Sequence, residues 1–163
     1  MPLFSHDREM LASGMHAPDF ELNDLAGGRV RLSGLLERAP VLLAFFKVSC
    51  PVCQLTFPYL ERLAKNEGVQ IVGISQNDEK ATRAFNDRYG VTFPTLVDEA
   101  AEGYIVSNAF GISSVPSIFV VETDGRVSAA FSGFSKRDLE MFGKRVNIAP
   151  FAPGEKVPEF KAG

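Results

Sequence analysis

The chain contains two cysteines, and both lie in one four-residue window, Cys50-Pro51-Val52-Cys53. An apolar run at 41–46 precedes this window, and a helical pattern at 56–66 follows it. Cysteines three positions apart at the start of a helix can face each other and close a small disulfide ring. The free N–H groups and the positive dipole end of such a helix favour thiolate over thiol. The pair therefore predicts thiol–disulfide exchange.

The positions of the two sulfurs predict different roles for them. Cys50, at the helix start, should be the more exposed, attacking sulfur. Cys53, one turn further in, should be covered and should resolve the mixed disulfide. Pro51 falls near the first helical position, where its missing N–H costs nothing. This chemistry needs neither a metal ion nor an organic cofactor, so we expect none.

Three other interpretations of the cysteine pair are open. A structural disulfide would close a four-residue loop, which constrains the unfolded chain little. A structural zinc site needs four ligands. Besides the two cysteines, the strong candidates are His6 and His16, and both lie near the N-terminus. Two inert core thiols would be unusual at the end of a strand. The placement between an apolar strand and an amphipathic helix favours a redox dithiol.

Strand and helix patterns alternate around the cysteines. Strand patterns fall at 20–22, 30–32, 41–46, 69–74, 95–97, 117–121 and 127–131. Helical patterns fall at 33–36, 56–66 with an internal Pro58 that predicts a kink, from a cap at Asn77 or Asp78 to 89, at 100–110, and from a capping box at Ser135 and Asp138. Alternating elements imply parallel neighbours, whereas the Asp124-Gly125 turn implies an antiparallel edge. We therefore expect an α/β fold: a mixed central sheet, helices on both faces and an N-terminal β-hairpin.

Composition narrows the class of protein. The chain has 163 residues, which suits one domain, and its net charge of −3 argues against a nucleic-acid binder. No apolar run approaches the roughly 18 residues of a membrane span. Residues 1–10 lack a basic region followed by an apolar stretch, so no signal peptide is visible. As it stands the sequence predicts a cytoplasmic protein, or an extracytoplasmic one if a leader has been removed. Its oligomeric state cannot be read.

The chain divides into three parts. We expect an N-terminal segment at 1–13, one folded domain at 14–146, and an extended, proline-containing segment at 147–163. The last segment either straps across the domain or is mobile. Three apolar side chains could fasten it: Phe151, Val157 and Phe160.

Together these features resemble the thioredoxin-like fold. They are closest to the TlpA/ResA-type thiol–disulfide oxidoreductases within the redoxin (AhpC/TSA-like) group. The resemblance rests on the stretches 14–20, 45–53, 57–60, 89–94, 111–117 and 124–127, and it covers about residues 14–146. It implies a reductase of protein disulfides, with a protein disulfide or dithiol as substrate and an electron-donor protein as second partner.

The resemblance adds residues around the cysteines. Such proteins carry a cis proline beside the cysteine pair, and Val115-Pro116 matches it. The backbone of Val115 could then pair with an extended substrate strand. The group often has an acid near the site, for which Asp78 and Glu79 are candidates, with a plain helix first turn as the alternative. Lys47 could raise thiolate character or could be an ordinary surface lysine.

Two further functions remain as alternatives. Peroxiredoxins share this fold, but their reactive cysteine follows a Thr or Ser by three positions. Lys47 and Cys50 occupy the corresponding positions before Cys50 and Cys53. The TlpA/ResA-type group usually has Trp directly before its first cysteine. Ser49 stands there in this sequence, so partner docking is expected to differ. The third possibility is a non-catalytic binding module in which the cysteine pair is incidental.

Overall fold

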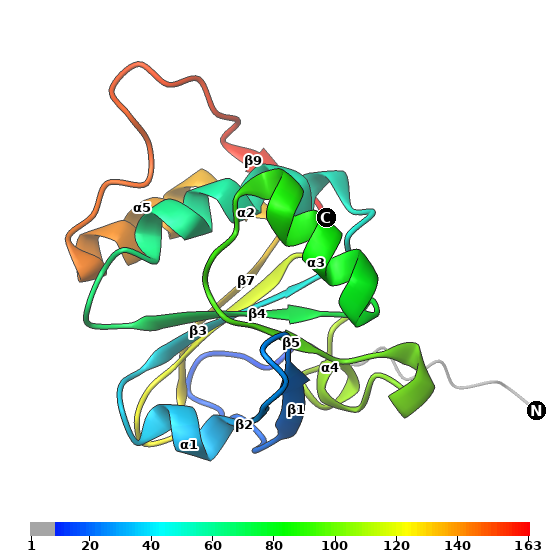
Figure 1. The fold of residues 1–163 in the computed structure, drawn as a ribbon. Coiled ribbons are helices and arrows are strands. Elements are labelled where there is room, and N and C mark those ends of the chain that lie inside the picture. The colour runs from blue at the N-terminus through cyan, green and yellow to red at the C-terminus, as the bar shows by residue number, and fades with distance from the viewer. Residues whose placement is uncertain (1–8) are drawn as a thin grey trace, which may run out of the picture.

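The computed structural model describes residues 9–163, so positions 1–8 of the predicted N-terminal segment, His6 included, lie outside the described part. A mixed sheet of seven strands forms the centre of the molecule, in the order β2-β1-β5-β4-β3-β6-β7 (Figure 1). Its strands are β1 (Glu21–Asp24), β2 (Arg29–Arg31), β3 (Val41–Phe46), β4 (Gln70–Ser75), β5 (Thr95–Val97), β6 (Ser117–Val121) and β7 (Val127–Ser132). β3, β4 and β5 are parallel neighbours, and the other pairs are antiparallel. The predicted fold class is confirmed.

Helices cover both faces of this sheet (Figure 1). The helices are α1 (Leu32–Leu36), α2 (Pro51–Leu63), α3 (Glu79–Tyr89), α4 (Ile105–Ala109) and α5 (Lys136–Val146), with a short 3-10 helix, η1 (Ala100–Glu102). α2, α3 and α5 lie on one face, and α1 and α4 lie on the other. No helix within residues 9–163 has the length and apolar character needed to cross a membrane.

The central strand β3 is buried along its whole length, as its unbroken apolar run predicts. Because successive side chains of a strand point to opposite faces, Phe45 and Phe46 serve two different clusters. Phe46 contacts Phe57 of α2, with ring centroids 4.3 Å apart, on one face. Phe45 contacts Phe110, with centroids 5.1 Å apart, on the other. The strand that leads to the cysteines is therefore held rigidly from both sides.

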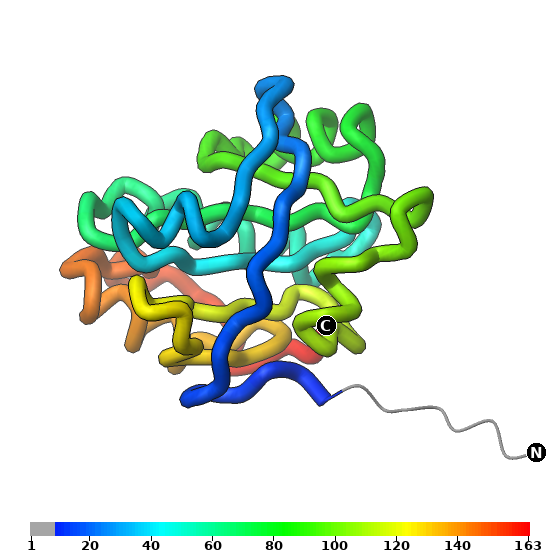
Figure 2. Tube along the Cα trace, turned by 90° about the horizontal axis from the view of Figure 1, so that it is seen from below, coloured from blue at the N-terminus to red at the C-terminus, as the bar shows by residue number. Residues whose placement is uncertain are grey.

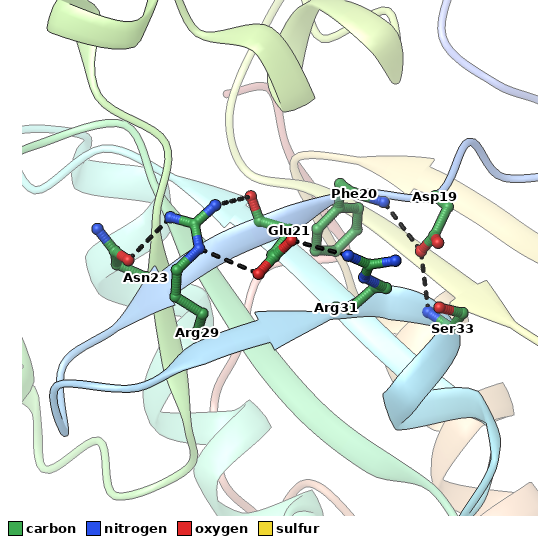
Figure 3. Close-up of polar contacts among 7 residues, drawn as sticks. All are labelled: Asp19, Phe20, Glu21, Asn23, Arg29, Arg31 and Ser33. Atoms are coloured by element: carbon green, nitrogen blue, oxygen red, sulfur yellow. Dashed lines mark hydrogen bonds and ion pairs between the residues drawn. The ribbon is translucent and has the colours of Figure 1, made fainter.

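The predicted N-terminal hairpin is confirmed, and β1 adds it antiparallel to β5. Glu21 on β1 accepts hydrogen bonds from Arg29 and Arg31 on β2 (Figure 3). These bonds, from Arg31 first and Arg29 second, hold the pKa of Glu21 below its usual value. Asp19 accepts the N–H groups of Phe20 and Ser33, which ties the hairpin to the start of α1 (Figure 3).

Two helix predictions need correction. The helix expected at 100–110 is divided, because Gly103 and Tyr104 both adopt left-handed backbone conformations between η1 and α4. The buried carboxylate of Asp98 accepts two N–H groups at the start of α4, so α4 begins as a separate helix. The helix expected at 56–66 starts earlier and ends at Leu63. There the side-chain amide of Asn66 donates to the Leu63 carbonyl.

The segment 147–163 folds back over the domain. It ends in β9 (Phe160–Lys161), which pairs antiparallel with β8 (Phe134–Ser135) in a second, two-stranded sheet (Figure 1). The Phe151 ring packs 5.0 Å from Tyr59 of α2, whereas Phe160 is 57% exposed. Phe151 and β9 thus place this segment against the domain.

Candidate active site

The cysteine window lies at the junction of β3 and α2. Cys50 is the residue that caps α2, and its backbone is extended. Its sulfur accepts the backbone N–H of Cys53 at 3.1 Å, in the position that a Ser or Asp oxygen takes at an ordinary helix start. Pro51 occupies the first helical position. The chain therefore places a sulfur atom at the positive end of a 13-residue helix.

The two sulfurs differ in burial and are not bonded to each other. Cys53 is fully buried, whereas Cys50 is partly exposed. Burial, and then the hydrogen bond with Cys50, raise the pKa of the Cys53 thiol. Cys53 is thus a covered, protonated thiol beneath an accessible one.

The loop before β6 closes the site on its other side. The carbonyl oxygen of Val115 accepts the Cys50 thiol at 3.4 Å. The Val115–Pro116 peptide bond is cis, as predicted from the resemblance, and it is the one cis bond within residues 9–163. The structure therefore brings Cys50 and Cys53 together with Val115 and Pro116, from two separate parts of the sequence.

The remaining candidates lie further from the sulfurs. Asp78 accepts the Ala81 N–H at 2.8 Å and caps α3. Glu79 forms an exposed ion pair with Arg83 one turn along. Among the described residues neither acid has a hydrogen bond or ion pair with Cys50 or Cys53.

Lys47 lines a small groove beside the site. This groove measures ≈ 200 Å³, and Val115 forms part of its wall. The carbonyl of Lys47 accepts the Cys50 N–H at 3.2 Å, and its side chain is exposed. Lys47 thus contacts the cysteine window through its backbone carbonyl, and the residue itself is exposed.

Sequence reasoning missed the residues that fix the loop before Cys50. The side chain of Asn77 accepts the Val48 N–H at 2.9 Å, and the side chain of Gln54 donates to the Val48 carbonyl at 3.0 Å. Asn77 is held in turn by Ser75, whose hydroxyl accepts its N–H at 3.0 Å. Asn77 follows β4 where Cys50 follows the parallel neighbour β3. Because parallel strands end at one sheet edge, this proximity could have been expected.

Residues 9–163 hold no group of three His, Cys, Asp or Glu side chains that could bind a metal ion. His16, one of the two histidines considered for zinc, lies in a bridge to Arg126 at the far end of the β6–β7 hairpin. The other, His6, lies outside the described residues.

Comparison with known proteins gives one family match and several close structural neighbours. The model of the AhpC/TSA family matches residues 13–130. The chain is 33% identical over 134 residues to the thiol-disulfide oxidoreductase ResA of Halalkalibacterium halodurans, which covers 80% of this chain and 74% of the relative.

Two solved structures share the fold. The thioredoxin domain of a thiol-disulfide oxidoreductase from Bacteroides vulgatus superposes with a TM-score of 0.74 at 25% identity, over 84% of this chain and 99% of that one. The peroxidoxin BcpB from Mycobacterium tuberculosis superposes with a TM-score of 0.68 at 28% identity, over 85% and 94%.

Proposed function

Because the chain belongs to the AhpC/TSA family and is a thioredoxin-like oxidoreductase of the TlpA/ResA type, we propose that it reduces disulfides of other proteins through Cys50 and Cys53. One observation carries the proposal: the accessible sulfur of Cys50 lies between the N–H of Cys53 and the carbonyl of Val115, with a buried thiol one helical turn away. In this arrangement the accessible Cys50 can attack a substrate disulfide, and the buried Cys53 can then resolve the mixed disulfide.

The reaction proceeds in two exchanges. The Cys50 thiolate attacks one sulfur of the substrate disulfide, forms a mixed disulfide and releases the other substrate sulfur as a thiolate. Cys53 then loses its proton and attacks the Cys50 sulfur. The Cys50–Cys53 disulfide forms and the second substrate thiol leaves. Two electrons pass to the substrate, and the buried Cys53 stays protonated until the mixed disulfide places its target beside it.

Val115 and Pro116 form the substrate groove in this proposal. Pro116 has no N–H, so the backbone there offers the groups of Val115 to an extended substrate strand. The Val115 carbonyl already lies 3.4 Å from the Cys50 sulfur. A peptide that pairs at Val115 would bring its disulfide to Cys50.

The electrostatics of the site favour the reducing direction. Strong oxidants of this fold owe their potential to a stabilised reduced form with a very acidic thiol. Within residues 9–163, one backbone N–H and no charged side chain donates a hydrogen bond to the Cys50 sulfur. Burial keeps the second thiol, Cys53, protonated. A reducing direction is therefore supported by the lack of a charged donor to the Cys50 sulfur among the described residues, and the reduction potential tests it.

The three residues predicted to affect the thiol pKa, Lys47, Asp78 and Glu79, have different roles in this proposal. Lys47 is the one of the three that lines the small groove beside Val115, so we assign it to substrate contact. Asp78 and Glu79 act through α3, whose N-terminus they stabilise. An electron-donor protein must restore the dithiol after each turnover. The exchange works in the cytoplasm or outside it, wherever a donor of lower potential is present.

Peroxide reduction is the second candidate, because the peroxidoxin BcpB shares the fold at 28% identity. Against it, Lys47 and Cys50 stand three positions before the two cysteines, where a peroxidase of this fold has a hydroxyl. The family placement as an oxidoreductase also disfavours a non-catalytic binding module.

The test is the reduction potential of the Cys50–Cys53 pair, equilibrated against glutathione and dithiothreitol buffers, with peroxide consumption followed in parallel. A value near or below about −250 mV without fast peroxide turnover is expected of a reductase. A value of about −120 to −180 mV would instead identify an oxidase or isomerase. Fast peroxide turnover would establish the peroxidase in its place.

A further inference from the structure

The end of the C-terminal segment lies on the substrate groove. Beyond β9 the chain reaches Gly163, which packs against the Val115 carbonyl. A Cβ atom built on Gly163 would lie 1.9 Å from the Val115 oxygen and 3.2 Å from the Pro116 nitrogen. The same oxygen is 3.4 Å from the Cys50 sulfur. Residues 160–163, here called the tip, thus cover the backbone that the proposed function assigns to substrate, and Figure 2 shows the C-terminus beside the segment that follows α4.

A second glycine allows this close approach. Gly133, between β7 and β8, has a positive φ of 76°. A Cβ atom there would lie 2.4 Å from the Lys161 carbonyl oxygen. The N–H of Gly133 also donates to the Pro116 carbonyl at 2.8 Å. The tip therefore crosses the domain over a glycine that is itself bonded to the groove.

The base of the segment is firmly attached. Arg62 on α2 donates to both carboxylate oxygens of Glu155, at 2.6 and 3.0 Å, and to the Pro150 carbonyl at 3.0 Å. The Phe151 ring packs against Tyr59, also on α2. These contacts hold the segment near 150–155 whatever the tip does.

The tip is held much more weakly than the base. All of its residues are exposed, and β9 is two residues long. Before it, Glu159 accepts the Lys136 N–H at 3.1 Å, and its side chain pairs with Lys136 at 3.5 Å in a largely exposed ion pair. Within residues 9–163 no hydrogen bond joins Gly163 to Val115. A substrate strand that hydrogen-bonds Val115 would therefore offer contacts that the tip does not make.

We propose that the tip is a built-in competitor for the peptide groove, which must leave Val115 and Pro116 before a protein disulfide can bind. The inference rests on the proposed function, since it concerns the groove of that reaction. Because the base stays attached, the tip competes within the molecule and its effect does not fall on dilution. Protein substrates meet this barrier, whereas a small disulfide that needs Cys50 alone does not.

The competition has a measurable size. The apparent affinity for substrate falls by the fraction of molecules whose groove is open. Detaching the tip should therefore raise kcat/KM for a peptide disulfide by roughly three- to tenfold. The rate with a small aromatic disulfide should change less than about twofold, because that reagent does not use the groove.

The test uses three full-length variants. Gly163→Val and Gly133→Ala each place a side chain where the tip now makes its closest contacts. Gly90→Ala is the matched control: Gly90 also has a positive φ, of 68°, but a Cβ atom there meets nothing within 4 Å. It reproduces the backbone strain of Gly133→Ala without touching the tip. Thermal unfolding checks that all three variants fold, and Gly163, exposed at the end of the tip, carries little risk to the core.

Two readouts separate this inference from the proposed function. The first is the ratio of Cys50 alkylation rates with a peptide-linked maleimide and with iodoacetamide, which needs no redox activity. The second is kcat/KM for a peptide disulfide against a small aromatic disulfide. We expect both ratios to rise in Gly163→Val and Gly133→Ala and to stay unchanged in Gly90→Ala.

The contrary outcomes are equally distinct. Unchanged alkylation ratios in Gly163→Val and Gly133→Ala, a rise in one of the two alone, or an equal rise in Gly90→Ala would overturn the competitor. If the alkylation ratios rise as expected but no variant and no wild-type protein reduces any disulfide, the proposed function fails while the tip is still shown to cover the groove.

Discussion

The sulfur of Cys50 accepts the backbone N–H of Cys53 at 3.1 Å, while the sulfur of Cys53 itself is buried. One residue therefore supplies both the hydrogen bond that caps the helix and the thiol that lies beneath it. The relationship follows from the spacing of the pair, because an N-cap side chain reaches the N–H two or three residues ahead. It separates an accessible sulfur from a protected one before any substrate arrives.

Replacement of Cys53 by Ser should trap substrate on Cys50. The first exchange needs the accessible sulfur alone, but the mixed disulfide cannot be resolved without the second. Incubation with a peptide disulfide and mass spectrometry should show one adduct, on Cys50. Cys50→Ser is the control and should give no comparable adduct, because the remaining thiol is buried. Adducts of equal yield in the two variants would contradict the assigned roles.

The buried thiol should make stability fall at high pH. Burial raises the pKa of Cys53 above its ordinary value of 9.0, so the folded protein holds a proton that the unfolded chain releases. The stabilisation is complete below pH 9.0 and is lost as pH rises from there towards the folded pKa.

The measurement is urea unfolding at several pH values between about 8 and 10.5, a window that brackets the ordinary thiol pKa. Wild-type protein should lose more free energy of unfolding across this window than Cys53→Ala, whose titration lacks the buried thiol. Parallel curves for the two proteins would show that Cys53 is not titrated in this way.

Local patterns predicted most of the elements because local physics determines them. The apolar run 41–46 became β3, and the capping residues Asp78 and Ser135 start α3 and α5. The prediction failed at 100–110, where periodicity alone suggests one helix. The side chain of Asp98, outside the periodic stretch, starts a new helix instead.

The residues of the candidate site also differ in how far the sequence predicts them. Cys50 and Cys53 could be found from their spacing, and Val115 and Pro116 from a family resemblance. Asn77 carries no local signal, because its contact with Val48 joins positions 29 residues apart, and only its place after a parallel neighbouring strand points to the site. Nor does the sequence show that residues 160–163 lie on Val115, since the exposed contacts of this tip leave no periodic signal.

Loss of the Asn77 side chain should loosen the cysteine loop. Its oxygen accepts the partly buried Val48 N–H at 2.9 Å, and Asn77→Ala leaves that N–H without its partner. We expect a loss of about 1 kcal/mol in the free energy of unfolding, together with slower reduction of a peptide disulfide. Asn77→Asp keeps an acceptor oxygen and should restore most of both. If Asn77→Ala is less stable but reduces disulfides at the wild-type rate, the contact is structural alone.

The pair between Glu122 and Arg145 should contribute a stability that disappears in acid. Arg145, in the last turn of α5, donates to both carboxylate oxygens of Glu122, at 2.6 and 2.7 Å, and these bonds lower the pKa of Glu122 below its ordinary 4.5. The stabilisation is present above pH 4.5 and is lost as pH falls through the lower folded value. Both side chains are partly exposed, so Arg145→Ala should cost no more than about 1 kcal/mol at neutral pH and almost nothing near pH 3.

Lys144→Ala is the matched control. It removes a positive charge from the same turn, and Lys144 has no ion pair among the described residues. A difference between Arg145→Ala and wild type that persists at pH 3, or an equal pH-dependent loss in Lys144→Ala, would assign the effect to packing or to the helix dipole and not to the Glu122 pair.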